Sequence, residues 1–190
     1  MSNFRRKIYQ RMLEWKQGNG TSALLIEGAR RIGKTTIVKV FAENEYASHI
    51  FIDFNTASDH VKQAFNLYLN DLDALFMVLQ VAYGVRLERR RSLIVFDEVQ
   101  KFPKAREAVK YLVEDGRYDY IETGSLISIK ENVQDISIPS EEEMVRMYPM
   151  DFEEFLWAMN EEQLMDYIRL CFKREIALDE GLHHKAMMLF

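Results

Sequence analysis

The segment from Gly28 to Thr35 reads Gly-Ala-Arg-Arg-Ile-Gly-Lys-Thr, which places two glycines, a lysine and a threonine at a characteristic spacing. The two glycines let the backbone wrap so that successive N–H groups point inward and form a nest for an anion. The spacing predicts a phosphate-binding P-loop, in which Lys34 reaches the β- and γ-phosphates of a nucleotide and the Thr35 hydroxyl ligates Mg²⁺. The alternative is a glycine turn that happens to precede a helix beginning with Lys-Thr.

This loop lies between the apolar residues 22–27 and the amphipathic residues 34–44, as a P-loop must lie between a strand and a helix. The N-terminal N–H groups and the dipole of that helix would add to the anion site. We therefore expect ATP, and the ADP that it leaves, to bind here together with Mg²⁺. The residues expected to hold the nucleotide are Gly28, Ala29, Arg30, Arg31, Ile32, Gly33, Lys34, Thr35 and Thr36.

Two acids, Asp97 and Glu98, directly follow the apolar residues 93–96. At the carboxyl end of a central strand, where open α/β sheets bind ligands, Asp97 would hold Mg²⁺ through water. The carboxylate of Glu98 would orient and polarise the attacking water as a general base. The same pattern also describes a strand that runs into a polar loop, but its combination with the upstream P-loop favours the functional interpretation.

A third candidate follows the next predicted strand, in the sequence Thr123-Gly124-Ser125. If this strand lies between the P-loop strand and the Asp97 strand, Thr123 or Ser125 would project toward the γ-phosphate and sense its presence. Thr123 is the stronger of the two candidates. The alternative is an ordinary turn built from Thr, Gly and Ser.

These residues favour some functional classes over others. A glutamate beside the strand-end Asp97 is expected of an ATPase that couples hydrolysis to a conformational change. An ATP-binding switch or assembly module with little turnover is one alternative, and a P-loop small-molecule kinase, which has less need of Glu98, is another. The guanine-reading sequence of small GTPases and the signature of transporter ATPases are absent.

An arginine from another subunit could complete the site, and the candidates are Arg30, Arg31, Arg106, Arg117 and Arg146.

The composition sets the wider limits. With 190 residues, 48% hydrophobic and 29% charged, the chain has the composition of a globular α/β domain. A net charge of −5 argues against general electrostatic binding to nucleic acid or to a membrane surface. Cys171 is the only cysteine, and the sequence contains neither an apolar signal-peptide core nor 18 consecutive apolar residues. We expect a cytoplasmic protein without a membrane partner.

Apolar strands alternate with helices through the first 125 residues, which predicts a parallel sheet with helices on both faces. Strands are expected over 22–27, 48–54, 92–96, 118–122 and 145–148, and helices over 3–17, 34–44, 59–83 with a break near 70, and 103–115. Residues 130–143 resemble a loop, with Glu141 to Glu143 as a solvated turn. We expect an ATPase core over 1–150 and a helical segment over 151–190, with a capping box at its start, a weak break near Asn160, and more of the protein beyond it.

Several of these motifs together resemble one family. They are the P-loop, Phe96-Asp97-Glu98-Val99-Gln100, Thr123-Gly124-Ser125, and Tyr148-Pro149-Met150-Asp151-Phe152-Glu153-Glu154-Phe155. The chain resembles the prokaryotic AAA-type P-loop ATPases of unassigned cellular role, whose longer members carry a further C-terminal domain. The resemblance implies a RecA-like core, ATP and Mg²⁺, with Lys34, Thr35, Asp97 and Glu98 in their usual roles. It also implies that active sites shared in a homo-oligomer are common, and it leaves open whether the client is a protein or a nucleic acid.

Overall fold

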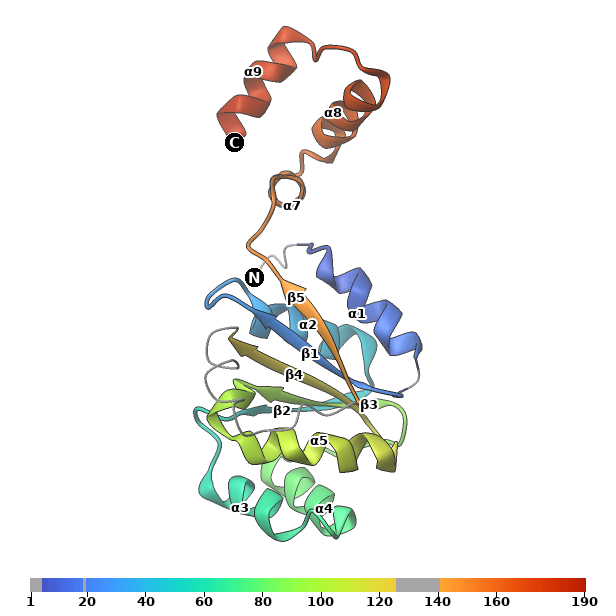
Figure 1. Cartoon of the computed structure of the whole chain (residues 1–190), viewed down its shortest axis with the longest axis vertical. Coiled ribbons are helices and arrows are strands. Elements are labelled where there is room, and N and C mark those ends of the chain that lie inside the picture. Colours follow the sequence, from blue (N-terminus) through green and yellow to red (C-terminus); the bar gives the residue numbers. More distant parts are fainter. Residues whose placement is uncertain (1–4, 19, 126–140) are drawn as a thin grey trace. The chain divides into compact units, whose positions relative to one another are not determined.

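The computed structural model describes residues 5–18, 20–125 and 141–190. The chain divides into two compact units. The first unit is Ile8–Tyr148, and the second is Pro149–Phe190 together with residues 5–7. In the described part of the first unit, five parallel strands form one sheet in the order β2-β3-β4-β1-β5 (Figure 1). They are β1 (Ala23–Gly28), β2 (Ser48–Asp53), β3 (Ser92–Asp97), β4 (Asp119–Ser125) and β5 (Glu142–Met147). This confirms the predicted α/β class and the RecA-like parallel sheet.

Helices cover both faces of this sheet. The helices α1 (Ile8–Gln17) and α2 (Lys34–Glu45) pack on Leu24, Leu93 and Ile121. The opposite face is covered by α3 (Asp59–Leu67), α4 (Leu72–Tyr83) and α5 (Pro103–Asp115). Because successive strand residues point to opposite faces and both faces are covered, β1 and β3 contain continuous apolar runs, residues 23–26 and 93–96, rather than an alternating pattern. Strand β4 is buried along its whole length although it contains polar residues such as Glu122 and Thr123.

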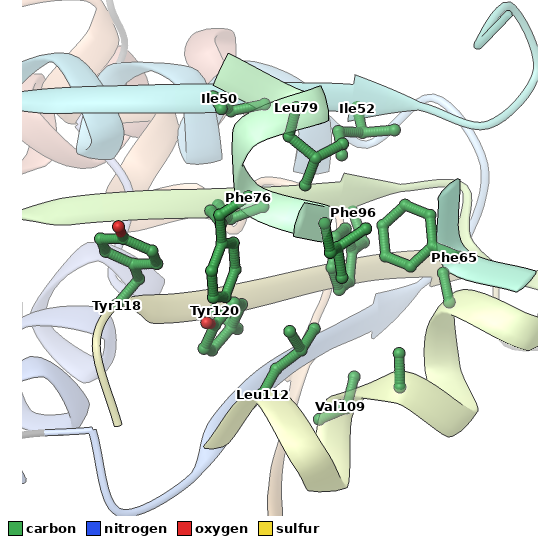
Figure 2. Close-up of a cluster of buried hydrophobic side chains, with 14 of the residues drawn as sticks. Ile50, Ile52, Phe65, Phe76, Leu79, Phe96, Val109, Leu112, Tyr118 and Tyr120 are labelled. Atoms are coloured by element: carbon green, nitrogen blue, oxygen red, sulfur yellow. The ribbon is translucent and has the colours of Figure 1, made fainter. Parts of the chain in front are cut away.

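The larger of the two cores lies beneath α3, α4 and α5. Figure 2 shows Phe65, Phe96 and Tyr120 in this cluster, where the rings of Phe65 and Phe96 meet edge-on with centroids 5.6 Å apart. Such aromatic pairs add to the free energy gained by burying their apolar area. Parallel pairing, from Leu93 with Asp119 to Phe96 with Glu122, holds β3 and β4 side by side, so the ends of these two strands have fixed positions.

Local signals explain where the helices begin and end. The predicted break near residue 70 is present, because α3 ends at Leu67 and the Asp71 carboxylate caps α4 by accepting the N–H of Ala74 at 3.1 Å. Helix α5 has the predicted limits, with a proline in its first turn and Gly116 at φ 66° after its last residue.

Other predicted boundaries are wrong. Of the predicted solvated turn at Glu141 to Glu143, only Glu141 lies in a turn, because β5 begins at Glu142, three residues before the predicted start. The Glu142 side chain is only 1% exposed and forms an ion pair with Arg106 of α5. Strand β4 continues through Thr123 to Ser125, where a turn was an alternative. Helix α1 begins at Ile8 rather than at residue 3. Residues 130–140 of the predicted loop lie outside the described ranges.

The second unit is helical. It contains α7 (Phe152–Ala158), α8 (Glu162–Arg174) and α9 (Glu180–Leu189), which share a small core of Leu156, Leu164 and Ala186. The predicted capping box is formed by Asp151 and Glu154 at the start of α7. The chain breaks near Asn160, as the sequence predicts, and again at residues 175–179, which it does not predict. None of the helices in the described ranges combines the length and apolar character that a membrane span needs.

Candidate functional site

The predicted P-loop joins the end of β1 to the start of α2. Gly33 has φ 95°, a left-handed conformation that favours glycine, and directly precedes the first residue of α2. Gly28 is needed for space, since a Cβ atom there would lie 2.3 Å from the backbone oxygen of Met147 in β5. Arg31 is also left-handed, at φ 64°. Alternation of this kind turns successive backbone N–H groups toward a common point, which is the arrangement that binds phosphate.

Lys34 lies inside this loop. Its Nζ atom donates to the backbone oxygens of Gly28 at 3.1 Å and Ala29 at 2.7 Å. The side chain is buried, and burial lowers the pKa of the ammonium, while the negative charges of Glu98 and Asp97 act in the opposite direction. The loop therefore holds a partly desolvated cation that an anionic ligand would stabilise.

The other predicted nucleotide-binding residues lie in the same segment of chain. Ile32 and Thr35 are half-buried, whereas four residues are exposed, namely Ala29, Arg30, Arg31 and Thr36. Thr36 lies in the first turn of α2, directly after Thr35. The structure thus brings the nine residues together at one strand-to-helix connection.

Asp97 connects β3 to the start of α2 through the Thr35 hydroxyl. It is the last residue of β3, and its two carboxylate oxygens lie 3.0 and 3.1 Å from the Thr35 hydroxyl. The Thr123 hydroxyl also donates to Asp97. Burial raises the pKa of Asp97, and the hydrogen bonds from Thr123 and Thr35 partly offset that effect. The three side chains come from α2, β3 and β4, so the order of the sheet determines that they meet.

The chemistry of these groups fits Mg²⁺. A threonine hydroxyl and a carboxylate are hard oxygen donors, which Mg²⁺ prefers. Among residues 5–18, 20–125 and 141–190, no group of three or more His, Cys, Asp or Glu could hold a metal ion. A threonine hydroxyl beside one carboxylate suits Mg²⁺ that is bound together with phosphates and water.

Glu98 follows Asp97 in a left-handed conformation, at φ 55° and ψ 44°. Its backbone N–H donates to the Thr123 hydroxyl at 3.3 Å. The Gln100 side-chain amide donates to the Glu98 carboxylate. The sequence did not predict this second contact. Gln100 was visible in the motif that carries the family resemblance, but nothing in its spacing indicated this contact.

Strand β4 lies between β1 and β3, which is the condition on which the sensor prediction depends. Thr123 pairs in register with Ile26 of β1 and hydrogen-bonds Asp97 at the end of β3. Ser125 pairs with Gly28, where the P-loop begins. Both candidates therefore lie in the strand beside the loop, and Thr123 contacts both acids.

The arginines proposed for a neighbouring site differ in exposure. Arg106 is buried, and its guanidinium contacts both carboxylate oxygens of Glu142, so it cannot reach another subunit. Arg117 forms ion pairs with Asp115 and Asp73, and Arg146 forms one with Glu27. Arg30 and Arg31 are exposed on the P-loop itself.

Comparisons with known proteins identify a family. A family model described as an AAA domain matches residues 20–156. The solved structure of the Aeropyrum pernix ORC1 protein in complex with DNA is similar, with a TM-score of 0.52 and 12% identity over 98% of this chain and 65% of that chain. A DNA replication initiation factor has a TM-score of 0.46 and 12% identity over 96% of this chain and 57% of that chain.

The structure of C. elegans PCH-2 has a TM-score of 0.44 and 11% identity over 94% of this chain, and this chain covers 50% of it. The chain therefore spans between half and two thirds of the length of these three structures. At these identities the likeness to the ORC1 protein shows the fold alone. A search of curated proteins found no significant match.

Proposed function

Because this chain belongs to the AAA domain family of P-loop ATPases, we propose that it binds ATP with Mg²⁺, hydrolyses it, and couples hydrolysis to a conformational change. One observation carries the proposal. The side chains of Thr35, Asp97 and Thr123, from three different elements, meet at the carboxyl edge of the sheet beside the P-loop lysine. That edge is where open α/β sheets bind their ligands.

Lys34 would bind the phosphates. On ATP binding, its ammonium would leave the carbonyl oxygens of Gly28 and Ala29 for oxygens of the β- and γ-phosphates. Hydrogen bonds between charged partners are stronger than those to neutral carbonyls, so the exchange favours the bound state. The inward-pointing N–H groups of the loop and the N-terminus of α2 would bind the remaining phosphate oxygens.

Thr35 and Asp97 would hold the metal. The Thr35 hydroxyl would ligate Mg²⁺ directly, and the Asp97 carboxylate would hold it through water. When bound, Mg²⁺ supplies positive charge that neutralises the phosphates. The present hydrogen bonds from Thr35 and Thr123 keep the Asp97 oxygens oriented toward the loop.

Glu98 would act on the nucleophile. The oxygen of a water molecule attacks the γ-phosphorus as the bond to the β-γ bridging oxygen breaks, and ADP leaves. The Glu98 carboxylate accepts the proton that the water loses. Thr123 would sense the γ-phosphate, because its hydroxyl contacts both Asp97 and the backbone N–H of Glu98.

A short route supports coupling to a conformational change. Gly28, the first residue of the loop, pairs in register with Met147, the last residue of β5. The close approach of these two residues means that a rearrangement of the loop would displace the end of β5. The chain enters the helical unit two residues later, at Pro149.

Calorimetry with Mg²⁺ and ATP tests the binding step. We expect the parent chain to bind, and Lys34→Ala to bind at least about 100-fold more weakly, which corresponds to about 2.8 kcal/mol. Lys39→Ala is the matched control, because Lys39 is an exposed lysine of the same helix. Equal affinity of Lys34→Ala and the parent would contradict the assignment of the P-loop.

A further inference from the structure

The short 3-10 helix η1 (Val99–Lys101) folds Gln100 back onto Glu98. Two backbone hydrogen bonds define this turn, from the Lys101 N–H to the Glu98 oxygen at 2.8 Å and from the Phe102 N–H to the Val99 oxygen at 3.0 Å. Val99 is buried and anchors the turn in the core. The turn brings the Gln100 side-chain nitrogen to the Glu98 carboxylate, so the contact follows from the backbone conformation.

The orientation of the Gln100 amide follows from its chemistry. Its nitrogen is the donor to one carboxylate oxygen of Glu98. Turning the amide around would place its oxygen against that carboxylate oxygen, so that two acceptors would face each other. The donor can therefore only be the nitrogen, and the amide constrains the carboxylate of Glu98.

Folding stability does not explain why a glutamine occupies this position. The side-chain oxygen of Gln100 is buried and has no hydrogen-bond partner among the described residues. A buried acceptor without a partner destabilises the folded state, whereas an apolar side chain of similar length would not. The amide thus contributes one contact, to Glu98, at a cost in stability.

We propose that Gln100 is a positioning residue for ATP hydrolysis, which holds one carboxylate oxygen of Glu98 so that the other is oriented to accept the proton of the attacking water. The inference rests on the proposed function of Glu98. A glutamate side chain has several rotamers of similar energy, and holding it in one of them lowers the entropy lost on reaching the transition state. Gln100 acts through Glu98 and need not touch the nucleotide.

The test replaces Gln100 with methionine in the full chain, which keeps the length of the side chain and removes the donor. We expect kcat for phosphate release to fall at least about 10-fold. We expect KM and the calorimetric Kd for ATP to stay within about 2-fold of the parent values. The Tm without nucleotide should change little, because the lost hydrogen bond to Glu98 and the removed unsatisfied oxygen act in opposite directions. Gln63→Met, at an exposed position of α3, is the matched control.

A second comparison shows whether Gln100 acts through Glu98. In a Glu98→Gln background, Gln100→Met should cause no further loss of turnover, since residues that act as one unit are not additive. A further loss of about 10-fold in that background would contradict the inference, as would parental kcat in the single variant. A joint fall in kcat, affinity and Tm would also contradict it, since that is the result of a packing role. No phosphate release by the parent would instead contradict the proposed function, and the inference with it.

Discussion

At the scale of single residues, Thr123 connects the two acids of the site. Its hydroxyl donates to the Asp97 carboxylate and accepts the backbone N–H of Glu98 at 3.3 Å. A hydroxyl can donate and accept at the same time, which few side chains of this size can do. A change in the position of Asp97 on ligand binding would therefore be passed to the backbone of Glu98.

Replacing Thr123 with valine tests this role, because valine has the same shape and no hydroxyl. We expect the Kd for ATP to change by less than about 3-fold, since the phosphate-binding residues are untouched. We expect kcat to fall about 10-fold, or about 1.4 kcal/mol, because Glu98 loses the partner of its N–H. Calorimetry and phosphate release measure the two effects. Thr123→Ser keeps the hydroxyl and should retain most of the activity, and a valine variant at the parent rate would exclude Thr123 from the mechanism.

At the scale of elements, three ionisable side chains of α5, β4 and β5 interact electrostatically with one another. Arg106 of α5 donates to the Glu142 carboxylate of β5 at 2.9 and 3.2 Å. Glu122 of β4 is fully buried, and neither of its carboxylate oxygens has a hydrogen-bond partner among the described residues. Burial raises the pKa of Glu122 well above its ordinary value, the charge of Glu142 raises it further, and Arg106 acts against both.

This raised pKa predicts a stability that depends on pH. The folded chain holds the proton of Glu122 more tightly than the unfolded chain, so the resulting stability is complete below the unfolded pKa. It declines as the pH rises above that value and is lost once the pH passes the folded pKa. Glu122→Gln removes the titration, so we expect its Tm relative to the parent to increase between about pH 5 and about pH 8, by at least about 2–4 °C.

Thermal unfolding at the two pH values measures this difference. Glu114→Gln is the control, because Glu114 is an exposed glutamate of α5. The control should show the same Tm difference from the parent at both pH values. A Glu122→Gln difference that is independent of pH would contradict protonation of the buried carboxyl.

Most of the sheet could be predicted because its signals are local. The glycine spacing of the P-loop and the apolar runs that end in Asp97 and Glu98 are readable in short stretches of sequence. Glu142 could not be predicted, because its buried partner Arg106 lies 36 residues earlier in the chain. Three consecutive acids have the same pattern whether they are solvated or paired, and only the fold distinguishes the two cases.

The contact of Gln100 was hidden for a different reason. Residues two positions apart do not face each other on an α-helix, and in a strand they share a face but lie about 6.6 Å apart along the chain. The 3-10 turn and the left-handed conformation of Glu98 bring these two side chains together. Residues other than glycine seldom adopt a positive φ, so the identity of Glu98 gave no reason to predict a left-handed conformation there.

At the scale of the whole molecule, the chain passes between its two units twice, after Lys7 and after Tyr148. Within the helical unit, Lys7 forms ion pairs with Asp151 and Glu153 at the start of α7, at 2.6 and 2.7 Å. Both connections therefore converge on the first turn of α7. The proposed coupling would use this arrangement, since the second connection directly follows β5.

The expectation of a homo-oligomer also belongs to this scale. An arginine finger from a second copy must be exposed, which excludes Arg106 and leaves Arg30, Arg31 and Arg146 as the exposed candidates. If a second copy completes the site, the rate of phosphate release per chain rises with protein concentration.

The central claim is that this chain hydrolyses ATP through Glu98. The most direct test is phosphate release by the purified chain with Mg²⁺ and ATP, measured over a range of protein concentrations beside Glu98→Gln. We predict turnover by the parent, and a loss of at least about 100-fold in the variant with unchanged ATP affinity, because an amide cannot accept the proton of the water. Equal rates in the two proteins, or tight ATP binding without turnover in either, would contradict the claim.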